Sequence, residues 1–264
     1  MSAESLHPQW DKLMPVWQAY LSELYSDDQD KERLYWYCEC LLNPQATLNN
    51  IDHFVVALEG YRVTELTARN PRIQRAWSAL RRFVEDVKPT LIAQGAALWV
   101  YGSMVYDDPG HLDYDILLTS ETFTHEFNQR TVRELMDLLE NQYWFPENIG
   151  TEGHITCLSL GLLKKFCLSF QRGDRDSVVA KWSYIHQEFH EPSILLTGVP
   201  YFLPNSQSPD ELRNRVRQLI SQNPMLAAIA ATDLEETLLI RQTGQKDPYW
   251  IDKKVAYLQR SSPQ

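Results

Sequence analysis

Two aspartates form the pattern in this chain that is best suited to chemistry. Residues 112–118 read Leu-Asp-Tyr-Asp-Ile-Leu-Leu. Because side chains alternate between the two faces of a strand, Asp113 and Asp115 are predicted to lie side by side on one face. Neighbouring carboxylates raise each other's pKa unless a positive charge lies between them. A hard divalent cation, Mg²⁺ or Mn²⁺, is therefore the expected partner of the pair, because carboxylate oxygens are its preferred ligands.

A glycine–serine pair precedes the aspartates and adds a second function. An apolar run at residues 98–101 ends in Gly102 and Ser103. Glycine has no Cβ, so the backbone can turn sharply there and approach a ligand closely. The hydroxyl and N–H of Ser103 can hold phosphate oxygens. A phosphate-binding turn beside paired carboxylates is the arrangement that metal-assisted phosphoryl or nucleotidyl transfer requires.

The spacing of these four residues resembles the signature of the DNA polymerase β-like nucleotidyltransferase superfamily, in which an apolar–Gly–Gly/Ser turn is followed by Asp–apolar–Asp/Glu–apolar. The resemblance covers residues 96–118, and its diagnostic positions are filled by Gly102, Ser103, Asp113 and Asp115. It implies an α+β fold with a small mixed sheet and helices. An Asx-rich hairpin turn with ordinary surface aspartates is the alternative interpretation.

The same resemblance implies an activity and a set of partners. Asp113 and Asp115 are expected to be catalytic and to hold the metal, while Gly102 and Ser103 seat the phosphates. The reaction is transfer of a nucleoside monophosphate from a nucleoside triphosphate, with ATP as the favoured donor. A small molecule or a protein is the expected acceptor.

The third acid of the superfamily has no clear counterpart in this chain. Members usually carry it on a later core strand, where it helps to hold the metal and acts as the base. The strand expected at residues 154–162 contains neither Asp nor Glu, so Glu152 and His154 at its beginning are the candidates. Asp174 and Asp176 fit an exposed turn better. The gap motivates a second hypothesis, a weakly active or inactive relative that binds nucleotides or, like an antitoxin, another protein.

Composition narrows the possible partners. The chain has 264 residues, a formal net charge of -10 and 44% hydrophobic residues, which suits a globular core. It contains no apolar run of about 18 residues, no secretory signal pattern and four cysteines, so we expect a cytoplasmic protein without a membrane span. The negative charge disfavours a nucleic-acid partner. Two arginine clusters are expected on solvated helix faces: Arg69, Arg72, Arg75, Arg81 and Arg82, and Arg213, Arg215 and Arg217.

Three regions are predicted along the chain. Residues 1–70 form an N-terminal helical region, residues 71–203 the nucleotidyltransferase-like core, and residues 204–264 a C-terminal helical region. Asn70 and Pro71 are expected to cap and open a helix. The expected strands are 96–101, 114–118, 154–162 and 193–196, and the expected helices are 8–24, 31–42, 49–61, 72–87, 119–141, 178–189, 209–222, 224–242 and 247–260.

Other reactive residues fit ordinary structural roles better. His186 and His190 have helical spacing, but Glu188 lies at neither position that a zinc protease needs. Cys38 and Cys40 lack a second ligand pair and are expected to be buried thiols. Ser103 lies outside a nucleophile-elbow motif, which disfavours a hydrolase.

Overall fold

The computed structural model describes residues 40, 43–108, 112–121, 123, 125–143, 154–171, 191–204 and 207–244. The helices predicted at 8–24, 178–189 and 247–260 lie outside these residues, as does all but Cys40 of the helix at 31–42. The elements in order are α3 Pro44–Glu59, α4 Pro71–Ala93, β1 Ala97–Val100, α5 Gly102–Val105, β2 Asp115–Ser120, α6 His125–Leu138, a π-helical turn Leu139–Tyr143, β3 His154–Ser159, α7 Leu160–Gln171, α9 Glu191–Thr197, β4 Val199–Phe202, α10 Pro209–Ser221 and α11 Pro224–Thr243.

The described residues pack into two units. One, here the sheet unit, comprises the described residues within 55–165 and 191–219; the other, the helical unit, comprises those within 1–54, 166–190 and 220–264. In the helical unit the alanine-rich N-terminal half of α11 is buried on all sides, from Leu226 to Ala231. Buried Asn223 caps that helix, because its Oδ1 accepts a hydrogen bond from Leu226 N at 3.3 Å.

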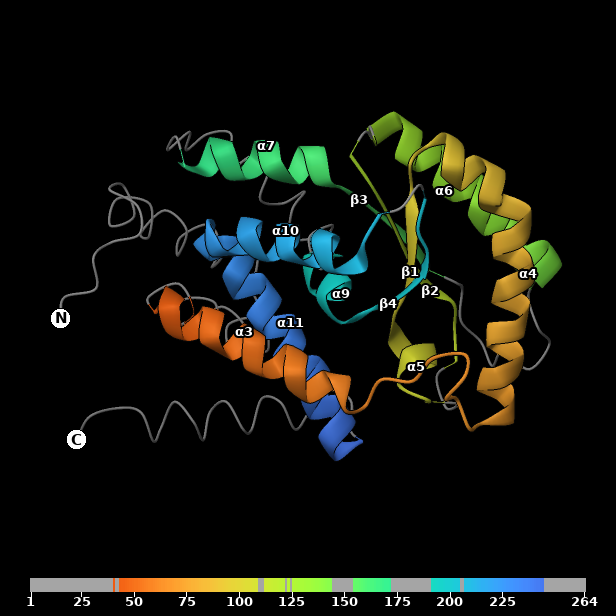
Figure 1. Cartoon of the computed structure of the whole chain (residues 1–264), viewed down its shortest axis with the longest axis horizontal. Helices are drawn as coiled ribbons and strands as arrows, with labels where there is room; N and C mark the ends of the chain where they lie inside the picture. The colour runs from red at the N-terminus through yellow and green to blue at the C-terminus, as the bar shows by residue number, and fades with distance from the viewer. Residues whose placement is uncertain are drawn as a thin grey trace, which may run out of the picture. The chain divides into compact units, whose positions relative to one another are not determined.

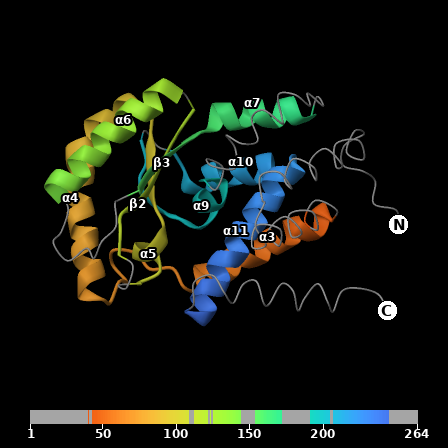
Figure 2. The same cartoon turned by 180° about the vertical axis from the view of Figure 1, so that it is seen from behind.

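A four-stranded mixed sheet organises the sheet unit, in the order β3-β2-β1-β4. Strand β1 runs antiparallel to both of its neighbours, and β3 runs parallel to β2. In both views of the molecule, α4 and α6 cover one face of this sheet, and α9 and α10 lie on the other side (Figures 1 and 2). The unit is therefore a mixed α/β layer structure, in agreement with the predicted small mixed sheet flanked by helices.

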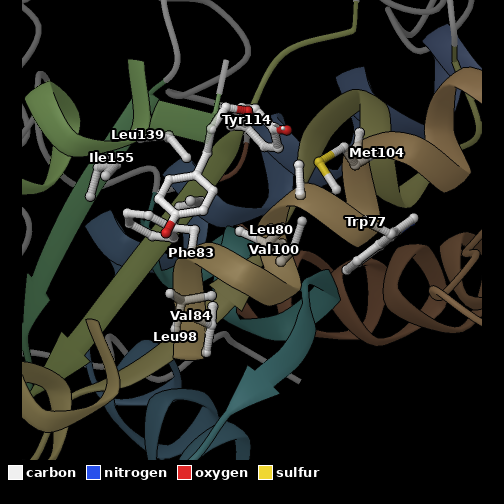
Figure 3. Close-up of a cluster of buried hydrophobic side chains, with 14 of the residues drawn as sticks. Trp77, Leu80, Phe83, Val84, Leu98, Val100, Met104, Tyr114, Leu139 and Ile155 are labelled. Carbon is white, nitrogen blue, oxygen red and sulfur yellow. Dashed lines mark hydrogen bonds between the residues drawn. The ribbon is translucent and has the colours of Figure 1, made fainter. Parts of the chain in front are cut away.

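The apolar core lies between α4 and the sheet. Strand residues Leu98 and Val100 pair with Leu118 and Ile116, and all four belong to one buried cluster with side chains of α4. Figure 3 shows this packing, with Trp77, Leu80, Phe83 and Val84 of α4 against the strands. Burial of this apolar surface is the main force that holds α4 on the sheet.

The boundaries of α4 follow from local chemistry. Asn70 Oδ1 accepts a hydrogen bond from Arg72 N at 2.9 Å, and Pro71 fits the first turn, so the predicted start is confirmed. The helix runs six residues beyond the predicted end at residue 87 and passes through Pro89, since Leu91 extends its buried face. It ends where Gly95 adopts a left-handed conformation with φ +56°.

Two predicted boundaries between strand and helix are wrong. Thr119 and Ser120, predicted to begin a helix, continue β2 because Thr119 pairs with Ala97 and Ser120 pairs with Ser159. Residues 160–162, predicted as strand, open α7, because Ser159 Oγ accepts a hydrogen bond from Leu162 N at 3.3 Å. In each case a partner distant in sequence, or a cap, decides between strand and helix.

The short strand predicted at residues 193–196 is also wrong. The structure has helix α9 there, and the strand follows it as β4, Val199–Phe202. Thr197 Oγ1 donates a hydrogen bond to Ser193 O at 3.1 Å, one helical turn back. A short apolar run fits either a buried strand or a buried helix. By contrast, α10 and α11 agree with the helices predicted at 209–222 and 224–242. Of the described helices, none is long and apolar enough to cross a membrane.

Candidate functional site

Gly102 and Asp115 lie in direct contact where β1 ends and β2 begins. The backbone of Gly102 is left-handed, with φ +67°, and a Cβ placed there would lie 1.8 Å from Asp115 Oδ2. Any other residue would collide with this carboxylate. Tyr101 N donates a hydrogen bond to Asp115 O at 3.0 Å, which extends the β1–β2 pairing to the turn itself. The glycine therefore serves first to admit the Asp115 side chain.

Ser103 and Asp113 form the second contact of the site. Ser103 Oγ donates to Asp113 Oδ1 at 2.8 Å and accepts from Asp113 N at 3.2 Å. The serine is buried, with 7% of its surface exposed, whereas both aspartates are partly exposed. Thus the structure brings all four predicted site residues together, each aspartate against one residue of the Gly-Ser turn.

Tyr114 anchors the segment that carries the two carboxylates. Its side chain is fully buried on the α4 side of the sheet, among Phe83, Leu139 and Ile155 (Figure 3). Its hydroxyl donates to Tyr143 O at 3.3 Å, in the π-helical turn. Burial raises the pKa of Tyr114, so the phenol stays neutral. The alternation predicted for residues 113–115 is consistent with this placement, although β2 begins only at Asp115.

Short backbone contacts fix the turn of α5. Asp108 N donates to Ser103 O at 3.0 Å and closes the segment after the helix. Val63 N donates to Val105 O at 2.7 Å and ties the loop after α3 to the other end of α5. The Gly-Ser turn is therefore supported from both the sheet and the preceding loop.

In the strand register, the residue opposite Asp115 is a histidine. Strand β3 begins at His154, which pairs with Asp115 across the parallel β2–β3 ladder. Glu152 lies outside the described residues, as do Asp174, Asp176, Cys38, His186 and His190. Within the described part of the chain, no group of three or more His, Cys, Asp or Glu residues is placed to hold a metal ion.

Arg213 is a feature of this unit that the sequence interpretation missed. It was expected on a solvated face, but its side chain is only 14% exposed and its guanidinium carbon lies 5.3 Å from the centre of the Trp99 ring. Trp99 shares the sheet face of Leu117 and Asp115 by register. Burial lowers the pKa of Arg213, and the nearby charge of Arg62 lowers it further. Arg75, Arg81 and Arg82 of α4 are exposed, as predicted.

The donor set fits a hard divalent cation that is completed by other ligands. Two carboxylates at one turn offer the oxygen atoms that Mg²⁺ or Mn²⁺ prefers, and Mg²⁺ sites commonly use one or two carboxylates together with water and substrate phosphates. Asp113 keeps its Oδ2 outside the hydrogen bond with Ser103, which involves Oδ1. The described residues alone do not form a closed metal cage.

Comparisons with models of protein families, with curated proteins and with solved structures each find no match to this chain.

Proposed function

We propose that this chain is a metal-dependent nucleotidyltransferase that moves a nucleoside monophosphate from a nucleoside triphosphate to a small-molecule or protein acceptor. The observation that carries the proposal is the double contact at the turn, Gly102 against Asp115 and Ser103 bonded to Asp113. Residues that are separate in the sequence thereby form one cluster, in which two carboxylates of the kind that hold a hard divalent cation lie against the Gly-Ser turn. ATP is the proposed donor.

The order of elements gives further support. A helix, a strand, the Gly-Ser turn, an antiparallel strand, a helix and a parallel strand follow one another from α4 to β3. The same order is expected of the superfamily core that the signature resembles. We therefore propose that the mixed α/β unit has the fold of the nucleotidyltransferase core.

Each residue of the turn has a task in the proposed reaction. Asp113 and Asp115 would hold Mg²⁺ or Mn²⁺, which supplies charge stabilisation on the phosphate oxygens when bound. Gly102 lets the Asp115 carboxylate lie against the backbone, and Ser103 orients Asp113. The oxygen of an acceptor hydroxyl attacks the α-phosphorus and its proton passes to water. The bond between the α-phosphorus and the oxygen that bridges it to the β-phosphate breaks, and pyrophosphate leaves. Preorganised carboxylates avoid a reorganisation cost at that moment.

The decisive experiment measures pyrophosphate release and nucleotide binding together. We expect release with a nucleoside triphosphate and Mg²⁺ or Mn²⁺, and its loss in Asp113→Asn and Asp115→Asn. Asp137→Asn, which makes the same charge change at an exposed position of α6, is the matched control. In thermal-shift titrations, a ligand at a hundredfold excess over its Kd stabilises the folded state by about 2.7 kcal/mol. Release that survives both aspartate substitutions would overturn the proposal.

One observation favours a second candidate, a nucleotide-binding or antitoxin-like protein-interaction module without transfer activity. No third metal-binding group accompanies the aspartates among the described residues, and His154 has the register position beside Asp115. This candidate predicts a metal-dependent thermal shift with nucleotide, lost in Asp113→Asn, but no pyrophosphate release from any triphosphate. Reproducible release that depends on the aspartates would exclude it.

A further inference from the structure

A second polar cluster lies at the same end of β1, on the side of β4. Gly198 joins α9 to β4, and a Cβ placed on it would lie 2.8 Å from Ile194 O and 3.1 Å from Val100 O. Val199 pairs with Val100, which precedes Gly102 by two residues. In a strand, two residues span about 7 Å. The α9–β4 turn is thus a close neighbour of the Gly-Ser turn (Figure 1).

The side chain of Arg213 is fixed at this turn by several contacts. Its Nη2 donates to Gly198 O at 2.8 Å, and its Nε donates to Leu195 O at 3.4 Å. The guanidinium also lies over the ring of Trp99, in a cation–π contact. Asp210, an exposed carboxylate, lies 3.7 Å from Nη1. The guanidinium is therefore held in one orientation before any ligand binds.

Arg62 brings a second guanidinium to the same helix end. Its Nη1 donates to Thr197 O at 3.4 Å, next to the carbonyl that Arg213 contacts. The adjacent residue, Val63, bonds to Val105 of α5. Among the described residues, Arg62 forms no ion pair with a carboxylate within 4.0 Å. Arg62 thus lies between α5, which begins at Gly102, and the α9–β4 turn.

Capping of the C-terminal end of α9 explains the hydrogen bonds of Arg62 and of Arg213 to backbone carbonyls. It does not explain why two guanidiniums lie at the same helix end. Basic side chains do stabilise the carbonyl end of a helix. Two guanidiniums at one end repel each other, and the pKa of Arg213 is lowered by its burial and by Arg62. Asp210 and Glu59 oppose this effect, while Arg217 adds to it. A multiply charged anion between the two guanidiniums would relieve the repulsion, and paired guanidiniums are well suited to phosphate oxygens.

We propose that Arg62 and Arg213 form a polyphosphate-binding site, which takes the terminal phosphates of the nucleoside triphosphate or the pyrophosphate product. The class of ligand is argued from the two guanidiniums, and its identity as part of the nucleotide rests on the proposed function. The site lies on the β4 side of the Gly-Ser turn, whereas Asp115 and β3 lie on its other side. The leaving group is thereby assigned to the β4 side of β1.

The test uses inorganic tripolyphosphate as the probe, in buffer without divalent cations, with calorimetric measurement of its Kd. Arg62→Gln is the main variant, because Arg62 is partly exposed and its side chain makes one hydrogen bond to the part of the chain that the structure describes. We expect its Kd to rise about tenfold or more, as for the loss of a charged hydrogen-bond donor. Arg213→Lys, which keeps the charge but loses the planar fork, is expected to weaken binding too. Arg130→Gln, an exposed position on α6 with the same charge change, is the matched control.

Each outcome separates this proposal from a capping role and from the proposed function. If Arg62 only caps α9, Arg62→Gln lowers the melting temperature while its Kd stays equal to that of Arg130→Gln, and the proposal is overturned. Absence of saturable binding by the wild type overturns it as well. Binding that depends on Arg62, with no pyrophosphate release from any triphosphate, supports the anion site and counts against the transferase.

Discussion

The two faces of the sheet in the sheet unit differ in what they present and in what covers them. On one face, Leu98, Val100, Ile116 and Leu118 form a continuous apolar surface against α4. On the other, Trp99 donates a hydrogen bond to Thr119 Oγ1 at 3.3 Å and supports a guanidinium. Thr156 on that face has a buried hydroxyl without a hydrogen-bond partner among the described residues. One face of the sheet is therefore apolar and packs against α4, whereas the other also carries buried polar groups.

The segment at residues 113–115 shows how close the two roles lie. The ring of Tyr114 is buried in the apolar cluster, whereas the carboxylates on either side of it reach the Gly-Ser turn. One step along the chain separates a core residue from a candidate catalytic one. Packing on the α4 face therefore holds in place the segment that carries the two carboxylates.

The largest effect on stability is expected from a cavity on the apolar face. Phe83 is 1% exposed, and its ring packs edge-to-face on Tyr143 with 5.6 Å between the centroids. Phe83→Ala should lower the free energy of unfolding by about 3–5 kcal/mol. Urea unfolding followed by circular dichroism measures the change. Glu85→Ala, exposed two positions further along α4, is the control and should stay within about 0.5 kcal/mol. A similar loss in both variants would contradict the assigned core.

Gly102→Ala tests the polar face. It should destabilise the protein less than Phe83→Ala does, but it should reduce activity strongly. The left-handed backbone costs alanine about 1–2 kcal/mol, and the new methyl group would also displace the Asp115 carboxylate. We expect pyrophosphate release to fall to the level of Asp115→Asn.

Gly95→Ala is a matched control for that backbone cost. Gly95 is also left-handed, with φ +56°, but a Cβ there has no atom within 4 Å. The control should therefore lose a similar amount of stability and keep its nucleotide binding. If Gly102→Ala bound nucleotide as well as Gly95→Ala does, the contact with Asp115 would have no functional meaning.

Local signals account for the parts of the fold that the sequence predicted correctly. Asn70 and Pro71 form a local signal for the start of a helix, because asparagine caps the N-terminus and proline fits the first turn. The apolar runs at 96–101 and 114–118 are long enough to indicate core strands. The grouping of Gly102, Ser103, Asp113 and Asp115 also followed from spacing. The reason for the glycine was only half predicted, because its nearest neighbour is Asp115 itself.

Contacts between distant residues decided the parts that sequence patterns could not predict. Thr119 joins β2 because Ala97, 22 positions earlier, pairs with it. Arg213 leaves the solvated face of α10 because Trp99 and the carbonyl of Gly198 offer it a site. Neither partner is visible in the residues that surround Thr119 or Arg213 in the chain. Tertiary pairing therefore overrode the local pattern in both places.

The smallest predicted effect concerns Tyr114, where the two faces meet. Tyr114→Phe removes the hydrogen bond to Tyr143 O, which should cost about 0.5–1.5 kcal/mol at pH 7. Because burial raises the pKa of this phenol above its unfolded value of about 10, its contribution is fully present below pH 10 and declines above it. The difference in unfolding free energy between wild type and variant should therefore shrink as the pH rises through about 10 to 11. Tyr61→Phe, at an exposed position, controls for the loss of a surface phenol. A difference that stays constant over this range would mean that Tyr114 is not held neutral in the core, and the anchor assigned to the two carboxylates would be lost with it.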